Sequence, residues 1–130
     1  MAKVNSATGI EFDSHEIRAV ELLKNIDGSY RVTGFGSAPL QSGVIANGMI
    51  SDAPLFTSAL EDMLKASGIK NTSPVVLGVN NENVIMRYAT FPKVPDDKLK
   101  SVISMQAQDY IPVPVCELGL DFVVIDETVD

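Results

Sequence analysis

Side chains able to perform acid–base, nucleophilic or metal chemistry are few and dispersed in this chain. His15 is the only histidine, and no second His or Cys lies near it to complete a metal site. It could act as a base with Asp13, but a solvated turn is the more common setting for such a residue. The single cysteine, Cys116, adjoins Glu117, whereas a reactive thiolate needs electropositive surroundings. We therefore predict no catalytic and no metal-binding residue.

The paired carboxylates are also not predicted to form a catalytic or metal-binding site. Asp96-Asp97 and Asp126-Glu127 are adjacent in sequence, and adjacent residues do not face each other on a helix. They are typical of a helix start and a solvated strand end. The chain has no Gly-x-Ser-x-Gly, Walker-type or zinc-ligand spacing.

The element around which the chain is arranged is a helix within residues 91–115. Pro95 and Asp96 favour its start, because proline suits the first turn and a carboxylate meets unpaired N–H groups there. Side chains at spacings of three and four predict one buried face. That face comprises Leu99, Val102, Ile103, Gln106 and Tyr110.

Two prolines end this helix. Pro112 and Pro114 lack a backbone donor and disfavour helix in the residue before them. Residues 111–115 are therefore expected to leave as an extended, poorly hydrogen-bonded ribbon with apolar side chains. Such a ribbon can dock a partner or serve as a buried connector, and a connector is the more common of the two.

The remaining pattern predicts a mixed α/β fold. Strands are expected at residues 7–12, 16–25, 29–38, 75–79, 84–91 and 118–126. Asp27-Gly28 predicts a hairpin, and Gly34 and Gly36 mark a bulge in the third strand.

A second helix is expected at residues 53–66, with a glycine-rich loop before it at 41–48. Asp52 caps this helix, Pro54 lies in its first turn, and Ser67-Gly68 closes it. Its buried stripe comprises Leu55, Phe56, Ala59, Leu60, Met63 and Leu64. The polar break at residues 80–83 predicts a boundary between two parts, 1–80 and 81–130.

Composition narrows the function classes. The net charge of −7 and the lack of a basic element argue against binding to nucleic acid or anionic lipid. No apolar run approaches the roughly 20 residues that span a bilayer, and the N-terminus lacks a signal-peptide core. One cysteine fits a reducing compartment. A cytoplasmic location is expected.

The sequence resembles the type IV pilus assembly proteins of the PilM family. Gln-Asp-Tyr-Ile-Pro-Val-Pro at residues 108–114, preceded by Phe-Pro-Lys-Val-Pro at 91–95, is the most specific part. Residues 9–22 are similar to the family's opening strand, phosphate loop and second strand. Residues 43–51 (GVIANGMIS) and 118–123 (LGLDFV) match later segments. The resemblance runs in register over nearly the whole chain.

The resemblance implies an actin-like (ribonuclease H-like) core subdomain at 1–80, followed by an inserted subdomain of strand–helix–strand(–strand) type at 81–130. Chains of this family continue past residue 130, so a fragment and a naturally short relative are both open. A sheet left incomplete would expose an edge that pairs with a second copy.

The resemblance also places a phosphate loop at the first hairpin. Its usual form, Asp-x-Gly-Thr/Ser-Ser-x-x-Lys, aligns with Glu11, Asp13, Ser14 and Arg18 at the acid, glycine, hydroxyl and lysine positions. Asp13 puts a negative charge where phosphate would lie, and two unit charges about 4 Å apart repel by about 4 kcal/mol at an effective dielectric of 20. We expect nucleotide binding to be lost or greatly weakened. ATP and Mg²⁺ would suit only a full-length, non-degenerate form.

In PilM-like proteins, a groove between the two subdomains receives the cytoplasmic N-terminal peptide of the membrane protein PilN. Here the expected contact residues are those of the hot-spot types beside the helix. They are Arg87, Tyr88, Tyr110, Ile111, Pro112 and Pro114. The resemblance thus implies a non-catalytic scaffold held at the inner membrane face by its partner, among other pilus assembly proteins. An actin-like ATP-binding protein and a self-assembling actin relative are the alternatives.

Overall fold

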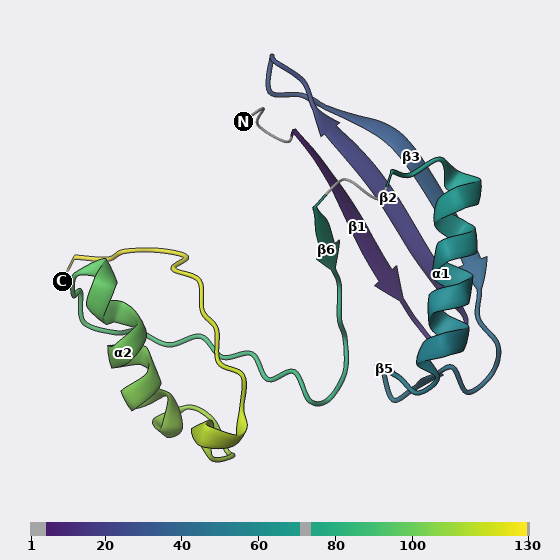
Figure 1. Cartoon of the computed structure of the whole chain (residues 1–130). Coiled ribbons are helices and arrows are strands. Elements are labelled where there is room, and N and C mark those ends of the chain that lie inside the picture. The colour runs from purple at the N-terminus through teal and green to yellow at the C-terminus, as the bar shows by residue number, and fades with distance from the viewer. Residues whose placement is uncertain (1–4, 71–73, 130) are drawn as a thin grey trace. The chain divides into compact units, whose positions relative to one another are not determined.

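The computed structural model describes residues 5–70 and 74–129 (Figure 1). The chain divides into two compact units, residues 1–84 and 85–130. The boundary between residues 80 and 81, and the assignment of the two parts to a core and an inserted subdomain, stay predictions. Among the residues described, no helix is long and apolar enough to cross a membrane.

A mixed sheet forms the first unit. Its strands follow the order β3-β2-β1-β6, with β1/β2 and β2/β3 antiparallel and β1/β6 parallel. Their bounds are β1 Ser6–Phe12, β2 Glu16–Lys24, β3 Tyr30–Pro39 and β6 Val75–Leu77. All four had been predicted to within two residues at either end. Figure 1 shows α1 (Ala53–Ser67) lying across one face of this sheet.

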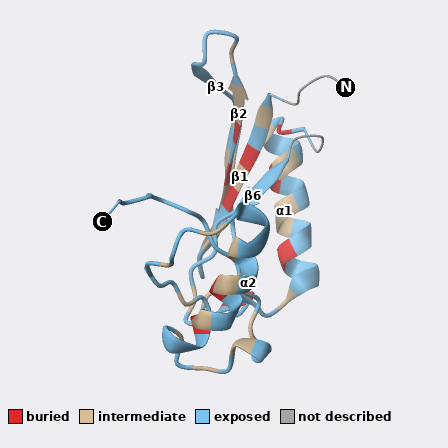
Figure 2. Cartoon of the chain, turned by 90° about the vertical axis from the view of Figure 1, so that its left-hand side faces the viewer, coloured by how far each residue is buried: buried red, intermediate tan, exposed pale blue. Residues whose placement is uncertain are grey.

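The core of this unit lies between α1 and the sheet, because alternate strand residues point to the helix. Ile10 on β1 and Ile17 and Ala19 on β2 are buried, and the residues between them are more exposed. Phe56 and Met63 face them from α1, and Figure 2 shows this buried layer in red. The opposite sheet face leaves apolar side chains exposed, namely Val20, Val32, Phe35 and Val76.

The ends of α1 follow the predicted signals. The Asp52 side chain accepts a hydrogen bond from the Leu55 N–H at 3.0 Å, and Gly68 ends the helix with φ of 73°. Left-handed backbone is strained for residues with a Cβ, so glycine suits this position. One residue of the predicted stripe differs: Leu55 is 42% exposed, because it lies in the first turn, at the rim of the core.

The third strand contains the predicted bulge. Its register with β2 shifts between Glu21 and Leu22, so that Thr33 has no opposite residue. The neighbouring glycines have a second reason to be there: a Cβ on Gly36 would come within 2.9 Å of the Ser67 Cβ on α1. The missing side chain therefore lets the helix end approach the strand closely.

The segment expected to be a glycine-rich loop contains a small hairpin. β4 (Ile45–Ala46) pairs with β5 (Met49–Ile50) across Asn47 and Gly48. These two residues have φ of 53° and 73°, as a type I′ turn requires. The prediction was wrong because a glycine-rich composition does not exclude a hairpin where Asn-Gly supplies its turn.

The second unit is built around α2 (Asp96–Gln106), which continues into the 3₁₀ turn η1 (Ala107–Asp109). A second 3₁₀ turn, η2, spans Val115–Glu117. Ile103 and Ala107 are buried, and Leu99, Val102 and Gln106 are half-buried. The predicted inward face of the helix is thus confirmed, apart from Tyr110, which is 40% exposed.

The strands predicted at residues 84–91 and 118–126 do not form in the described part of this unit. Alternating apolar residues indicate which side chains could face a core. A strand also needs a second strand at hydrogen-bonding distance, and alternation does not specify one. Here no ladder joins the two segments.

Candidate functional site

The first candidate site is the turn between β1 and β2. The Asp13 side chain closes it: Oδ1 accepts hydrogen bonds from the N–H groups of His15 at 2.8 Å and Glu16 at 3.0 Å. The Asp13 N–H in turn donates to the Glu16 carbonyl at 3.0 Å. This Asx-type turn uses a side chain where a phosphate loop would use a ligand. Ser14 and His15 are exposed at its tip.

Arg18 forms ion pairs with the acidic side chains in and beside the turn. Its guanidinium donates to Glu11 at 2.9 Å, to the other Asp13 oxygen at 3.0 Å, and to Glu16 at 2.5 Å. Glu11 reaches it because the two residues lie opposite each other in the β1/β2 register. Three carboxylates therefore share one cation, and the cluster carries a net negative charge at neutral pH.

The hydrogen bonds change the acidity of two groups. The N–H groups of His15 and then Glu16, followed by Arg18, lower the pKa of Asp13 to about 2. Hydrogen bonds to Glu11, Glu16 and Asp13 raise the pKa of Arg18. Asp13 thus stays ionised throughout the physiological range, and its charge remains in the turn.

The structure therefore brings Glu11, Asp13 and Arg18 together, with Ser14 beside them. The two N–H groups that could cradle an anion are already bonded to Asp13. Across the described residues, no group of three or more His, Cys, Asp or Glu could hold a metal ion. The weakened nucleotide binding expected for this loop stays a prediction.

The second candidate site follows α2. The N–H groups of Tyr110 and Ile111 both donate to the Ala107 carbonyl, at 3.0 and 3.1 Å. The Tyr110 ring packs against Phe91, with the ring centroids 5.8 Å apart and an interplanar angle of 59°. Pro112 and Pro114 are exposed, and Ile111 is half-buried. Four of the predicted contact residues thus lie together on one short segment.

This segment is not the extended ribbon that was predicted. The chain bends at Pro112 and Val113, and the side chain of Gln108 bonds to it. The Gln108 amide nitrogen donates to the carbonyls of Ile111 at 3.4 Å and Val113 at 3.2 Å. Its oxygen accepts from the Val115 N–H at 3.0 Å. The two prolines do lack backbone donors, as the sequence predicted. The side chain of Gln108 nevertheless supplies hydrogen bonds to this segment. We call residues 108–115 the glutamine-held bend.

The other two predicted contact residues stand apart from this bend. Tyr88 is 79% exposed, and the Arg87 guanidinium donates to the Met86 carbonyl at 2.9 Å. Among the described residues, neither side chain makes a hydrogen bond or ring contact with residues 110–114. The structure thus unites the residues after α2 and leaves Arg87 and Tyr88 as separate surface positions.

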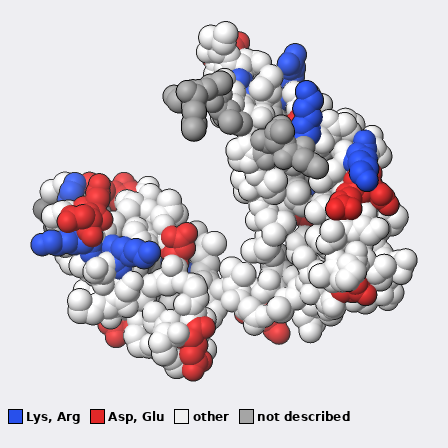
Figure 3. Space-filling model, in the orientation of Figure 1, with Lys and Arg blue, Asp and Glu red and all other residues white. Residues whose placement is uncertain are grey.

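Charge is distributed unevenly along the sequence of the second unit. Residues 101–130 contain no Lys, Arg or His. Their acidic residues are Asp109, Glu117, Asp121, Asp126, Glu127 and Asp130. The basic residues of the second unit all precede them, and the face visible in Figure 3 carries both signs of charge. Lys93 pairs with Glu127 at 2.5 Å, so part of the acidic charge is neutralised.

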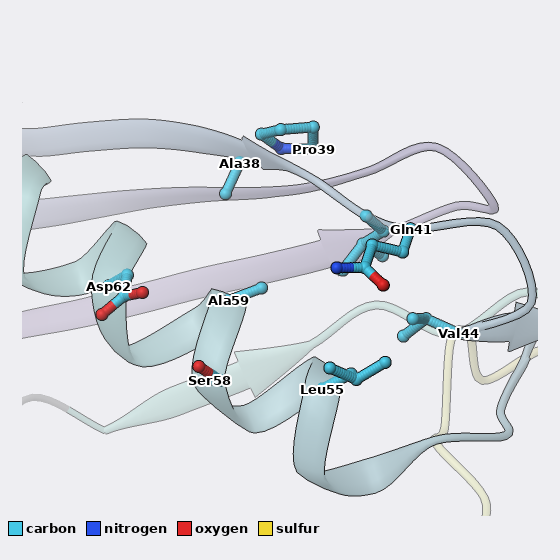
Figure 4. Close-up of a pocket in the computed structure, with 9 residues that line it drawn as sticks. Ala38, Pro39, Gln41, Val44, Leu55, Ser58, Ala59 and Asp62 are labelled. Carbon is cyan, nitrogen blue, oxygen red and sulfur yellow. The ribbon is translucent and has the colours of Figure 1, made fainter.

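A shallow pocket of about 320 Å³ lies in the first unit, between the end of β3 and α1. Figure 4 shows the side chains of Gln41, Val44 and Leu55 around it, with Ser58 and Asp62 farther along the helix. No sequence signal pointed to this pocket, because it arises from the packing of a helix face against a strand end.

Residues 9–130 match the family described as "Type IV pilus assembly protein PilM". The chain belongs to this family. A solved structure described as "PilM-PilN type IV pilus biogenesis complex" is similar, with a TM-score of 0.71 and 24% sequence identity. It matches 84% of this chain, which spans 31% of the solved PilM-PilN chain. The predicted mixed α/β, actin-like fold class is thereby confirmed.

A second solved structure, "Structure of diol dehydratase-reactivating factor in nucleotide free form", matches 56% of this chain and 12% of its own. Its TM-score is 0.41 at 13% identity. Membership of the PilM family therefore rests on the sequence match over residues 9–130, and the likeness to the PilM-PilN complex adds the fold.

Proposed function

We propose that this chain acts as a non-catalytic scaffold of a type IV pilus or related secretion machine. It binds the cytoplasmic N-terminal peptide of a PilN-like inner-membrane protein and stays at the inner membrane face through that partner. Membership of the PilM family and likeness to a chain of a PilM-PilN complex support this proposal. The observation that carries it is the glutamine-held bend, which presents Tyr110 and two exposed prolines on a fixed backbone.

The chemistry of the bend favours an apolar peptide that carries basic residues. Ile111, Pro112 and Pro114 offer apolar surface, and Tyr110 is 40% exposed with its ring held by Phe91. Rigid aromatic and apolar side chains lose little entropy on binding. The flanking residues 101–130 are acidic and lack Lys and Arg, so a basic partner would be steered toward them.

The absence of catalysis is supported by the first turn. The Asp13 carboxylate accepts hydrogen bonds from two N–H groups of this turn, and three carboxylates bond to Arg18. A phosphate would have to displace these bonds and approach a carboxylate that is ionised above about pH 2. The alternative proposal is the N-terminal portion of an actin-like ATP-binding protein. Micromolar binding of ATP and Mg²⁺ to the full chain, abolished by Glu11→Gln or Ser14→Ala, would favour that alternative.

Peptide binding is tested by fluorescence anisotropy. The probe is a labelled N-terminal peptide of the bitopic membrane protein that is encoded beside this chain. We expect Tyr110→Ala and Ile111→Ala to weaken binding at least tenfold, as truncation of a hot-spot residue does. Met105→Ala is the matched control, because Met105 is a 78% exposed apolar side chain on α2.

Arg87→Ala and Tyr88→Ala measure whether these separate positions also contact the peptide. Circular dichroism of each variant confirms that it is folded. Unchanged affinity in every variant between residues 87 and 114 would refute the peptide site. Capture of other pilus assembly proteins by the same chain would extend the scaffold role.

We also propose self-association of the chain through β6. All three of its residues are exposed, at 60%, 65% and 49% for Val75, Val76 and Leu77. Within the described residues β6 pairs with β1 alone, so its other edge keeps free backbone groups.

A further inference from the structure

Gln108 stands out because one exposed side chain makes three hydrogen bonds to a segment interrupted by two prolines. Its amide nitrogen donates to the carbonyls of Ile111 and Val113, and its oxygen accepts from the N–H of Val115. A glutamine amide has two N–H donors and one carbonyl acceptor. Both donors and the acceptor are therefore used on the same short stretch of backbone.

The backbone of the bend depends on this side chain because other partners are few. The prolines at 112 and 114 have no N–H to contribute. The Tyr110 and Ile111 N–H groups are used at the Ala107 carbonyl, which fixes only the start of the segment. The Pro114 and Val115 carbonyls are used within η2, by Glu117 and Leu118. Between these two anchors, Gln108 is the described residue that ties Ile111 and Val113 to the end of α2.

The role is specific to an amide of this length. Glutamate has the same shape, but its ionised carboxylate can only accept hydrogen bonds. It could keep the bond from Val115 while placing a negative charge against two carbonyl oxygens. Asparagine carries the same groups on a chain one methylene shorter. A bend held in this way is fixed before a ligand arrives, so less conformational entropy is lost on binding.

We propose that Gln108 is a positioning residue of the peptide site: its amide holds residues 111–115 in the bent form that the partner peptide recognises. This inference rests on the proposed peptide-binding function. Gln108 acts through Ile111 and Val113, whose carbonyls it ties down, and through Val115. The occupant is an apolar peptide with Lys or Arg, because residues 101–130 contain six acidic residues and no Lys or Arg, and one of the six, Glu127, is paired with Lys93.

The experiment compares the full chain with Gln108→Ala and Gln108→Glu. Anisotropy with the labelled partner peptide should show affinity reduced about tenfold for Gln108→Ala, and further for Gln108→Glu. Gln106→Glu is the matched control, since it makes the same substitution two residues earlier, at the end of α2. Amide hydrogen exchange, followed by NMR, gives an independent readout at Val115.

In both Gln108 variants the Val115 N–H should exchange faster, while the α2 amides and the thermal midpoint stay unchanged. A general loss of structure would instead accelerate exchange across α2 and lower the midpoint. If the unchanged chain binds peptide and both variants bind it equally well, the positioning role is refuted and the proposed function stands. If the unchanged chain does not bind the peptide, the proposed function fails, and this role of Gln108 fails with it.

Discussion

Single residues decide the character of the β1–β2 turn. The Asp13 carboxylate bonds to two N–H groups of the turn in which it lies. One residue thus uses, within the turn itself, two N–H groups that could otherwise bind an anion. Glu11 and Arg18, which lie opposite each other on β1 and β2, also pair, at 2.9 Å.

The titration of Asp13 gives a direct test at this scale. Because its folded-state pKa of about 2 lies below the ordinary value of 3.8, its interactions stabilise the fold above about pH 4 and are lost as the pH falls toward 2. We expect the carboxyl carbon, followed by NMR, to titrate near pH 2. Arg18→Ala should raise the midpoint only in part, since the N–H groups of His15 and Glu16 remain.

Arg31→Ala, which removes an exposed arginine from β3, should leave the midpoint of Asp13 unchanged. A midpoint near 3.8 in the unchanged chain would show that the turn does not hold the carboxylate in solution.

Glu21 has a structural role of the same local kind. Its side chain is buried at 6% exposure and accepts hydrogen bonds from the Thr33 hydroxyl at 2.7 Å and the Lys70 N–H at 3.3 Å. It thereby joins the bulge in β3 to the chain that leaves α1. Glu21→Ala should lower the free energy of unfolding by about 1–3 kcal/mol, because it removes two hydrogen bonds to a buried carboxylate. Urea denaturation measures this.

Glu61→Ala serves as the control for Glu21→Ala, since Glu61 is exposed on α1. Its effect should stay within about 0.5 kcal/mol. Equal effects of the two substitutions would refute the structural role assigned to Glu21.

At the scale of elements, the approach of α1 to β3 depends on glycine. A Cβ on Gly36 would lie 2.9 Å from the Ser67 Cβ and 3.5 Å from the Met63 Cγ. Gly36→Ala should therefore destabilise the fold by about 1–3 kcal/mol, as overpacking does. Gly9→Ala on β1 is the matched control, because its nearest atom would be 3.8 Å away. Thermal unfolding of both variants distinguishes overpacking at Gly36 from the general effect of replacing a glycine. Equal shifts of the thermal midpoint in the two variants would contradict overpacking.

The elements that the sequence predicted are those with local signals. The caps at Asp52 and Gly68 and the hairpin at Asp27-Gly28 depend on residues within one turn of each other, and they were predicted correctly. The Asn47-Gly48 hairpin has an equally local signal, although the glycine-rich segment around it also favours a loop. The resemblance to the family predicts which residues lie in the β1–β2 turn, but it does not predict their shared bonding to Arg18.

The predictions that were wrong concern features that depend on groups distant in sequence or on side-chain geometry. The strands expected at residues 84–91 and 118–126 required ladder partners that no local pattern identifies. The extended ribbon failed because Gln108 supplies donors that the proline rule does not consider. The role of Gln108 depends on its distances to Ile111, Val113 and Val115, which no sequence pattern specifies.

At the scale of the whole molecule, the two edges of the sheet differ in their protection against pairing. β3 carries Arg31 and a bulge at Thr33, which are two devices that discourage a second strand. β6 has neither a charge nor a bulge, and its three apolar residues are exposed. The net charge of −7 opposes the approach of a second copy. Association should thus depend on both concentration and salt.

We therefore expect the chain to self-associate through β6, more strongly at about 0.5 M salt, where charges are screened within about 4–5 Å. Val76→Lys should abolish the association, because a lysine on an edge strand disfavours a strand partner. Sedimentation velocity at increasing protein concentration measures it. Val32→Lys is the control: Val32 is 53% exposed on β3, so the same charge is added at the protected edge. If the unchanged chain stays monomeric in high salt, or if the Val76 variant still dimerises, β6 is not the contact.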